Sequence, residues 1–206
     1  MKIIEFEFEN WHTFCLRFNW LALIVATIVV IIASLIIKKL ARRLTYHSID
    51  VDEVSLGIGK SNIKLKYNKK DQEIAYKLWV ELNTRKIGLP YEEDYDVIVE
   101  VYNSWYDFFK IARELLKDVP PSRLPYSTKL ITLTTNVLNE GLRPHLTKWQ
   151  AKYRKWYDEN NQKSKSPQEI QKEFPEYDAL LSDLLITNKH MIEYKNLMYQ
   201  IAFNEK

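Results

Sequence analysis

The chain has 206 residues and a net charge of +3, and 46% of its residues are hydrophobic. Four glycines and seven prolines are few, while thirteen tyrosines and six tryptophans are many. This composition is typical of an ordered, mainly helical protein rather than of a disordered chain. The single cysteine, Cys15, excludes an internal disulfide and cysteine-based zinc sites.

The first 17 residues begin with MKIIEFEFENW, in which apolar and acidic side chains alternate over several positions. A period of two is typical of a strand. We expect either an edge strand or a frayed segment close to a membrane surface.

Residues 18–43 carry the pattern of a transmembrane helix. No side chain is charged from Phe18 to Ile37, and an α-helix needs about 20 residues to cross a hydrocarbon core of ~30 Å. A cleavable signal is the alternative, but the preceding segment is acidic and a basic stop-transfer pattern, KKLARR, follows. The basic flank belongs on the cytoplasmic side of the membrane. We therefore predict residues 1–17 outside and residues 44–206 in the cytosol.

Residues 53–67 predict a β-hairpin at the start of the cytosolic domain. Val54, Leu56 and Ile58 alternate with other residues, residues 59–62 supply a turn, and the alternation then resumes as far as Tyr67. The string GIGKS inside this hairpin invites comparison with a phosphate-binding P-loop. That motif needs glycine where position 54 holds valine, and it needs a helix rather than a strand to follow. We therefore exclude a P-loop nucleoside triphosphatase.

The following 52 positions or so read as two amphipathic helices. In residues 71–90, apolar side chains recur at four-residue spacing, and Gly88 suits the C-terminal cap. Residues 91–119 predict one long helix whose first turns are acidic. The carboxylates are those of Glu92, Glu93, Asp94 and Asp96. Their attraction to the helix dipole explains them more simply than a metal or acid–base cluster does.

Four further helices complete a helical bundle. A helix that begins near Ser127 is expected to end at Gly141, and a new helix is expected to begin at Pro144. The string SPQE, residues 166–169, matches a capping box, and a final helix is expected over about 176–203. The predicted fold class is mainly α: a single N-terminal transmembrane helix and a cytosolic helical bundle with a small β-hairpin.

Two basic stretches are candidates for ligand binding. The first is the second strand of the hairpin, and the second is the aromatic helix near Pro144. The candidate residues are Lys64, Lys66, Arg143, Lys148, Lys152, Arg154 and Lys155, with Trp149 and Tyr153 as aromatic neighbours. Cations beside aromatic rings bind phosphates and stacked bases. They also attract anionic lipids, or they cover a core with their aliphatic stems as a solvated face. All three interpretations stay open.

The sequence carries no pattern that predicts catalysis. The four histidines, at positions 12, 47, 145 and 190, have no paired spacing on one helix face and are read as structural or solvated. No Ser-His-Asp or Cys-His constellation can be nominated. We therefore expect no catalytic residue, no metal site and no cofactor.

One N-terminal span followed by a compact, mostly helical cytosolic domain resembles the membrane effectors of bacterial antiphage systems. These include type III CRISPR membrane proteins gated by cyclic oligoadenylates, cyclic-nucleotide-signalling effectors and retron membrane effectors. The resemblance, which is one of architecture, implies a non-enzymatic homo-oligomer in the bacterial inner membrane. Such an effector perturbs the membrane when its cytosolic domain senses a nucleotide, such as a cyclic oligonucleotide, or a partner protein. A membrane tether that docks a cytosolic partner protein is the alternative.

Overall fold

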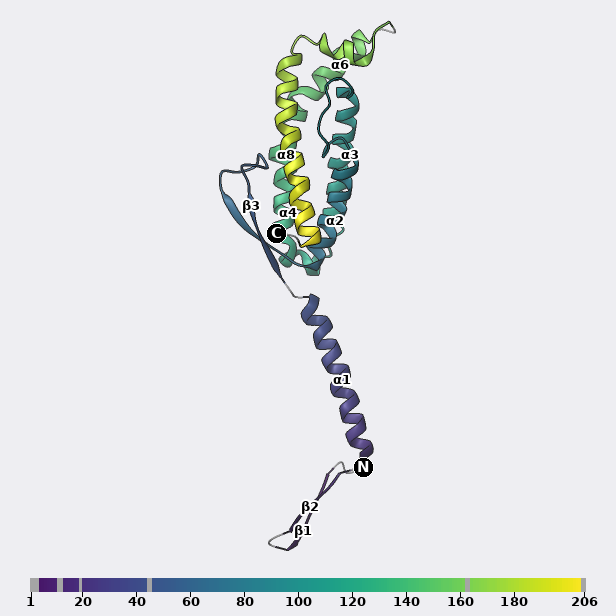
Figure 1. Cartoon of the computed structure of the whole chain (residues 1–206), viewed down its shortest axis with the longest axis vertical. Coiled ribbons are helices and arrows are strands. Elements are labelled where there is room, and N and C mark those ends of the chain that lie inside the picture. The colour runs from purple at the N-terminus through teal and green to yellow at the C-terminus, as the bar shows by residue number, and fades with distance from the viewer. Residues whose placement is uncertain (1–3, 11–12, 19, 44–45, 162–163, 205–206) are drawn as a thin grey trace. The chain divides into compact units, whose positions relative to one another are not determined.

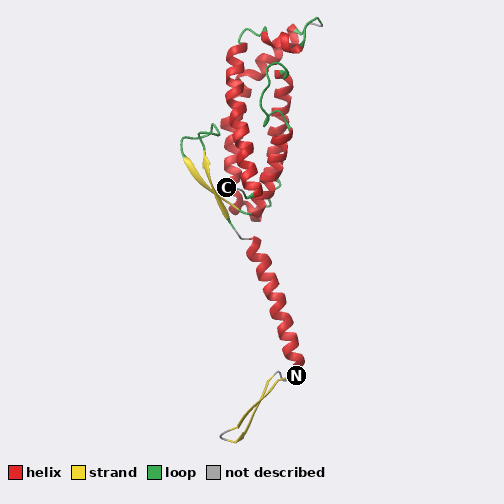
Figure 2. Ribbon diagram, viewed as in Figure 1, coloured by secondary structure: helices red, strands yellow, loops and turns green. Residues whose placement is uncertain are grey.

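The computed structural model describes residues 4–10, 13–18, 20–43, 46–161 and 164–204. It is mainly helical and forms two compact units, Met1–Thr45 and Tyr46–Lys206 (Figures 1 and 2). A helical bundle with a small antiparallel hairpin makes up the second unit, and one long apolar helix lies in the first. The predicted fold, which is mainly helical with one apolar N-terminal helix, a helical bundle and a small hairpin, is confirmed.

The first unit consists of a hairpin and a helix. Strand β1, Ile4–Asn10, pairs antiparallel with strand β2, Thr13–Phe18, so the strand-like start has a return strand that the sequence pattern did not predict. Helix α1, Trp20–Arg43, follows.

Helix α1 is long enough and apolar enough to cross a membrane over Leu23–Leu40, and none of this window is buried. The core helix of a soluble protein and a signal sequence can satisfy the same criterion of length and composition. The Thr27 hydroxyl donates to the Leu23 carbonyl at 2.7 Å, which satisfies its polar atom within the helix.

The hairpin of the second unit begins earlier than predicted. Strand β3, His47–Asp52, pairs with strand β4, Asn62–Tyr67, while Val54, Leu56 and Ile58 lie in the connecting loop. The Asp52 carboxylate accepts from the Val54 N–H at 3.0 Å, and this turn contact ends β3. The string GIGKS leads into β4 rather than into a helix, as expected.

Helix α2, Lys69–Thr84, starts at a capping box formed by Asn68 and Asp71 and buries the predicted stripe of Ile74, Leu78 and Leu82. The prediction that Gly88 caps this helix is wrong. A Cβ at Gly88 would lie 2.1 Å from the Leu82 carbonyl oxygen, so glycine allows two backbone segments to pack there rather than terminating α2.

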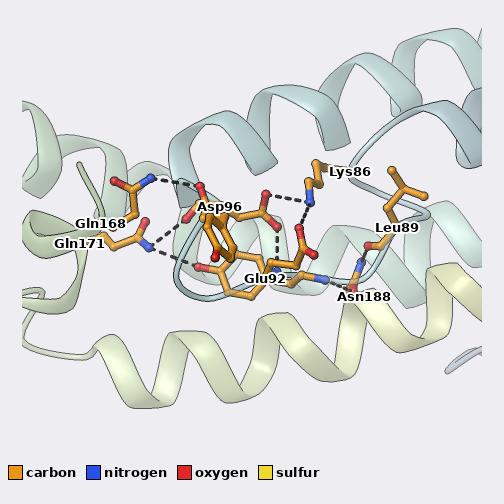
Figure 3. A network of polar contacts seen from close by, with 9 residues as sticks. Lys86, Leu89, Glu92, Asp96, Gln168, Gln171 and Asn188 are labelled. Atoms are coloured by element: carbon orange, nitrogen blue, oxygen red, sulfur yellow. Dashed lines mark hydrogen bonds and ion pairs between the residues drawn. The ribbon is translucent and has the colours of Figure 1, made fainter. Parts of the chain in front are cut away.

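Helix α3, Ile98–Lys117, is shorter than the predicted helix over 91–119. Residues 91–97 form a loop whose backbone is hydrogen-bonded by side chains that are remote in the sequence (Figure 3). The Gln171 side chain accepts from the Ile98 N–H at 2.9 Å and donates to the Asp96 carbonyl at 3.0 Å. The Asn188 side chain accepts from the Tyr91 N–H at 3.1 Å. These long-range contacts satisfy backbone groups that a helix would otherwise satisfy locally.

After the short 3₁₀ helix η1, Pro121–Arg123, one helical segment runs to residue 160 without the predicted break at Gly141. Its successive parts are α4, Leu124–Asn136; η2, Val137–Leu142; α5, Arg143–His145; η3, Leu146–Gln150; and α6, Ala151–Asn160. Segments η2 and η3 are π-helical. The wide turn ahead of Pro144 fits a residue that has no N–H for the helical ladder. Gly141 is a packing glycine, because a Cβ there would lie 3.3 Å from the Leu56 carbonyl oxygen.

Helix α7, Pro167–Lys172, has the predicted capping box of Ser166 and Glu169, and helix α8, Tyr177–Phe203, closes the bundle against α2. The core is rich in aromatic side chains. The largest fully buried ones are Trp105, Tyr102, Tyr153, Tyr194 and Phe108. The Tyr194 hydroxyl donates to Thr134 at 2.8 Å, so this buried polar atom is paired.

Candidate anion-binding groove

The structure does not bring the two predicted basic stretches together in one site. Lys64 and Lys66 are exposed on β4 and alternate with the buried Leu65 and Tyr67. Lys64 stands opposite Asp50 in the hairpin register, where opposite charges favour pairing of the two strands. The other candidates lie on α5, η3 and α6.

The two aromatic candidates are buried, so their ring faces are not available to stack on bases. Trp149 is 2% exposed and donates its indole N–H to Asp183 Oδ2 at 2.7 Å. Tyr153 is fully buried and packs edge-on against Phe174 at 5.3 Å between ring centroids. Both belong to the core because this face of the helix turns toward α7 and α8.

Most of the predicted cations have partners within the bundle. Lys148 Nζ lies 4.5 Å from the centroid of the Trp149 ring, and Lys152 forms an ion pair with Glu176. Arg154 donates to the side-chain oxygen of Asn103 at 2.7 Å. Lys155 lies 3.9 Å from Glu159. These contacts match the interpretation of a solvated, paired face better than that of a ligand site.

Arg143 is different, because it lies beside a groove between α3 and the segment that contains α5 and η3 and has no carboxylate within ion-pair distance among the described residues. Arg154 and Lys155 line a separate hollow that also contains two carboxylates, those of Asp158 and Glu159. The groove has a volume of about 440 Å³, within the usual range for small-ligand sites. Its lining residues are Tyr106, Asp107, Phe109, Lys110, Arg113, Arg143, Leu146 and Thr147.

The groove is positively charged. Lys110, Arg113 and Arg143 are exposed, and none of them has a carboxylate within ion-pair distance among the described residues. Nearby carboxylates are directed elsewhere: Asp107 lies 3.5 Å from Arg85, and Glu114 lies 2.7 Å from Lys117. The hydrogen bond from Lys117 lowers the pKa of Glu114, and the charges of Arg113 and Lys110 add to this effect.

An aromatic ring holds one of these cations in place. The Arg143 guanidinium lies 4.9 Å from the centroid of the Phe109 ring, and its Nε donates to Asn139 at 3.1 Å. This leaves the guanidinium's terminal N–H groups available for a phosphate, which arginine binds in a bidentate manner. Sequence reasoning found Arg143 but missed Lys110 and Arg113. Their three-residue spacing on a helix, next to Phe109, was the available signal.

A buried polar brace lies on the core side of the same segment. His145 Nδ1 is 2.8 Å from Asp183 Oδ2, and His145 Nε2 is 3.1 Å from the Tyr102 hydroxyl. Burial lowers the pKa of His145 despite the neighbouring Asp183, so the imidazole is neutral at pH 7. Burial alone would raise the pKa of Asp183, but the hydrogen bonds from His145 and Trp149 outweigh burial and lower it. The brace is therefore a neutral histidine held by a carboxylate.

Asp183 and His145 also line a small cavity of about 220 Å³ together with Gly57, Lys148 and His190. Within the part of the chain that the structure describes, no group of three or more histidine, cysteine, aspartate or glutamate residues could hold a metal ion.

The predicted acidic cluster at residues 92–96 is engaged by a cation (Figure 3). Lys86 Nζ lies 2.9 Å from Asp96 and 3.2 Å from Glu92. Asp96 also accepts from the Glu92 N–H at 2.8 Å. The carboxylates therefore shape the loop before α3 rather than the first turns of a helix.

The fold and the groove together define a mainly helical protein with one candidate membrane span and a cationic, ring-lined groove. No protein-family model matches this sequence, no curated protein matches it, and no solved structure matches its fold.

Proposed function

We propose that this chain is a single-pass membrane protein whose helical unit binds a phosphate-bearing ligand in the groove between α3 and α5. The observation that carries the proposal is the convergence of Lys110, Arg113 and Arg143, free of carboxylate partners among the described residues, around one cavity. In this proposal α1 spans the inner membrane of a bacterium, with residues 1–17 outside and the helical unit in the cytosol.

In this proposal the protein is a non-enzymatic effector of antiphage defence. It assembles into a homo-oligomer and perturbs the membrane when the ligand binds. A cyclic oligonucleotide is the class of ligand we favour, since it offers several phosphates to arginine and lysine together with bases for Tyr106. One α1 helix cannot enclose a pore, so membrane perturbation requires several copies.

A membrane tether is the second candidate. Leu185 and Ile186 are adjacent, exposed apolar residues on α8, and Tyr95 is exposed on the loop before α3. Apolar side chains on an otherwise charged surface favour contact with a partner protein.

The decisive experiment is native mass spectrometry of the full-length protein in detergent, with and without cyclic oligoadenylates and with inorganic phosphate as a second probe. We expect an oligomer that retains the oligonucleotide. Arg143→Ala and Lys110→Ala should each weaken binding by about tenfold or more, because one charge-assisted hydrogen bond contributes roughly 1.5–3 kcal/mol.

Lys155→Ala is the matched control, because Lys155 is an exposed cation on the same helical segment but outside the groove. This variant should bind the oligonucleotide with the same affinity as the unmodified protein. A ligand-free monomer would contradict the effector proposal and leave the tether. Equal losses for Lys155→Ala and Arg143→Ala would place binding outside the groove.

A further inference from the structure

A second exposed surface lies on the second unit, away from the groove, where α2 packs against the C-terminal part of α8. Four aromatic rings from these two helices form one cluster: Tyr76, Trp79, Tyr199 and Phe203. The ring centroids of Tyr199 and Phe203 are 4.7 Å apart, and those of Trp79 and Phe203 are 5.3 Å apart. Tyr76 and Phe203 remain 48% and 45% exposed. An aromatic cluster of this size is costly to leave in water.

The cluster lies at the end of the unit at which the chain enters from α1. His47, near the start of this unit, pairs with Tyr67 in the hairpin register. The Tyr67 hydroxyl donates to Asn204 at 2.9 Å, and Asn204 directly follows Phe203. A short chain of contacts therefore connects the first residues of the unit to the aromatic cluster.

The linker between the two units is short. Residues 44 and 45 separate Arg43 from Tyr46, and an extended chain of this length covers at most about 11 Å. If α1 spans a bilayer, this reach keeps the entry end of the helical unit near the cytoplasmic surface of that bilayer at any orientation of the unit.

The charge around the cluster is positive. Lys69 precedes Tyr76 by two helical turns on α2, and Lys195 precedes Tyr199 by one turn on α8, so each shares a helix face with a ring of the cluster. Neither lysine has an ion-pair partner among the described residues. Glu73, the carboxylate on α2 between Lys69 and Tyr76, is neutralised by Lys70 at 2.8 Å and Lys77 at 3.1 Å.

We propose that this aromatic and basic surface is a second membrane contact, which inserts Tyr76, Trp79 and Phe203 into the headgroup region of an anionic bilayer. Tryptophan and tyrosine favour the membrane–water interface because their rings are apolar and their N–H and O–H groups stay hydrated. Lysines beside them are attracted to anionic headgroups. The inference rests on the membrane anchoring by α1 proposed above, but not on ligand binding in the groove.

The test uses full-length protein reconstituted into vesicles of phosphatidylcholine and phosphatidylglycerol, some with brominated acyl chains as a quencher. Cys15→Ser removes the native thiol, and single fluorescent labels are attached after Phe203→Cys, Ile31→Cys or Ala151→Cys. Ile31 lies within α1 and reports its insertion. Ala151 is exposed beside Lys152, whose partner Glu176 precedes the opposite end of α8 from Phe203.

We expect the brominated lipids to quench the labels at positions 203 and 31 but not the label at position 151. The quenching at position 203 gives the ratio of protein with this surface on the bilayer to protein with the surface in water. Lys69→Glu combined with Lys195→Glu should lower this ratio by at least about tenfold, since each lysine near an anionic surface strengthens membrane binding by roughly fivefold. Vesicles of phosphatidylcholine alone should weaken the quenching at position 203 in the same way.

Quenching at position 31 without quenching at position 203 would overturn this inference while leaving the anchor in place. A label at position 203 that is shielded from aqueous iodide yet not quenched by lipid would assign the surface to a protein partner or a second copy instead. Lack of quenching at both positions would overturn the membrane anchor and this inference together, whereas loss of ligand binding alone would concern only the groove.

Discussion

Asp183→Ala tests the buried brace beside the groove. The Asp183 carboxylate accepts from His145 at 2.8 Å and from Trp149 at 2.7 Å, and both donors are almost fully buried. A hydrogen bond to a charged group contributes roughly 1.5–3 kcal/mol. Because the Asp183 side chain is 36% exposed, water competes for these donors, and we take the lower value for each bond. The expected loss in the free energy of unfolding is therefore about 3 kcal/mol.

The assay is urea unfolding of the full-length protein in mild detergent, followed by tryptophan fluorescence and far-ultraviolet circular dichroism. For a urea dependence of about 2 kcal/mol per molar, the midpoint should fall by roughly 1.5 M. Asp183→Asn keeps one acceptor oxygen and should lose about half as much stability.

Asp158→Ala is the control, because Asp158 is an exposed aspartate on α6 whose change should stay within about 0.5 kcal/mol. If Asp183→Ala cost no more than Asp158→Ala, the brace would not stabilise the bundle, and our assignment of an energetic role to His145 and Trp149 would be refuted.

Three further measurements follow from the same structure. The folded-state pKa values of His145 and His190 are lowered from 6.5, so the unfolded chain binds protons before the folded chain does. The free energy of unfolding should therefore fall as the pH drops below 6.5. The stabilisation that the lowered pKa of Asp183 contributes should persist until the pH falls below 3.8. Urea unfolding midpoints measured across this pH range test the effect of the histidines and that of Asp183. Gly88→Ala places a Cβ 2.1 Å from a backbone oxygen and should cost at least about 2 kcal/mol, whereas the atom nearest to a Cβ at Gly141 is 3.3 Å away, so Gly141→Ala should cost less. Ser166→Ala removes the capping box of α7 and should cost about 1 kcal/mol, which hydrogen exchange in α7 would reveal as faster local opening.

Local patterns were sufficient wherever the stabilising contacts are local. The capping box of Ser166 and Glu169 joins residues three positions apart, so its spacing in the sequence predicts it. The helical spacing of Ile74, Leu78 and Leu82 likewise predicts which face of α2 is buried, although it does not show that α8 covers this face. The apolar, uncharged character of α1 is likewise visible in the sequence alone.

The loop over 91–97 was misread as helix because its partners are remote in sequence. Gln171 lies 73 residues from Ile98, whose N–H it accepts, and Asn188 lies 97 residues from Tyr91. Without those side chains, the acidic residues before α3 look like the first turns of a helix. Acidic residues are common at the start of a helix, but here contacts with residues remote in sequence stabilise a loop instead.

The candidate site was only partly predictable for a related reason. A cation's value for ligand binding depends on which neighbours neutralise it, and this is set by the fold. Lys152 has Glu176 as a partner, whereas Arg143 rests on Phe109 and keeps its terminal N–H groups available. The spacing of Lys110 and Arg113 places them on one face of a helix beside Phe109, but only the fold shows that they line the same cavity as Arg143.

The segment over 137–150 is where local rules fail most clearly, and it is also where the groove and the brace meet. Arg143 and His145 are two positions apart, which on a helix separates their side chains by about 200°. One therefore faces the groove while the other reaches Asp183 and Tyr102 in the core. Had one helix ended at Gly141 and another begun at Pro144, as the sequence suggests, Arg143 would lie at the break between them instead of within a continuous helical segment. Departures from local preference are expected where a protein positions functional groups, and here the π-helical turns around Pro144 are such a departure.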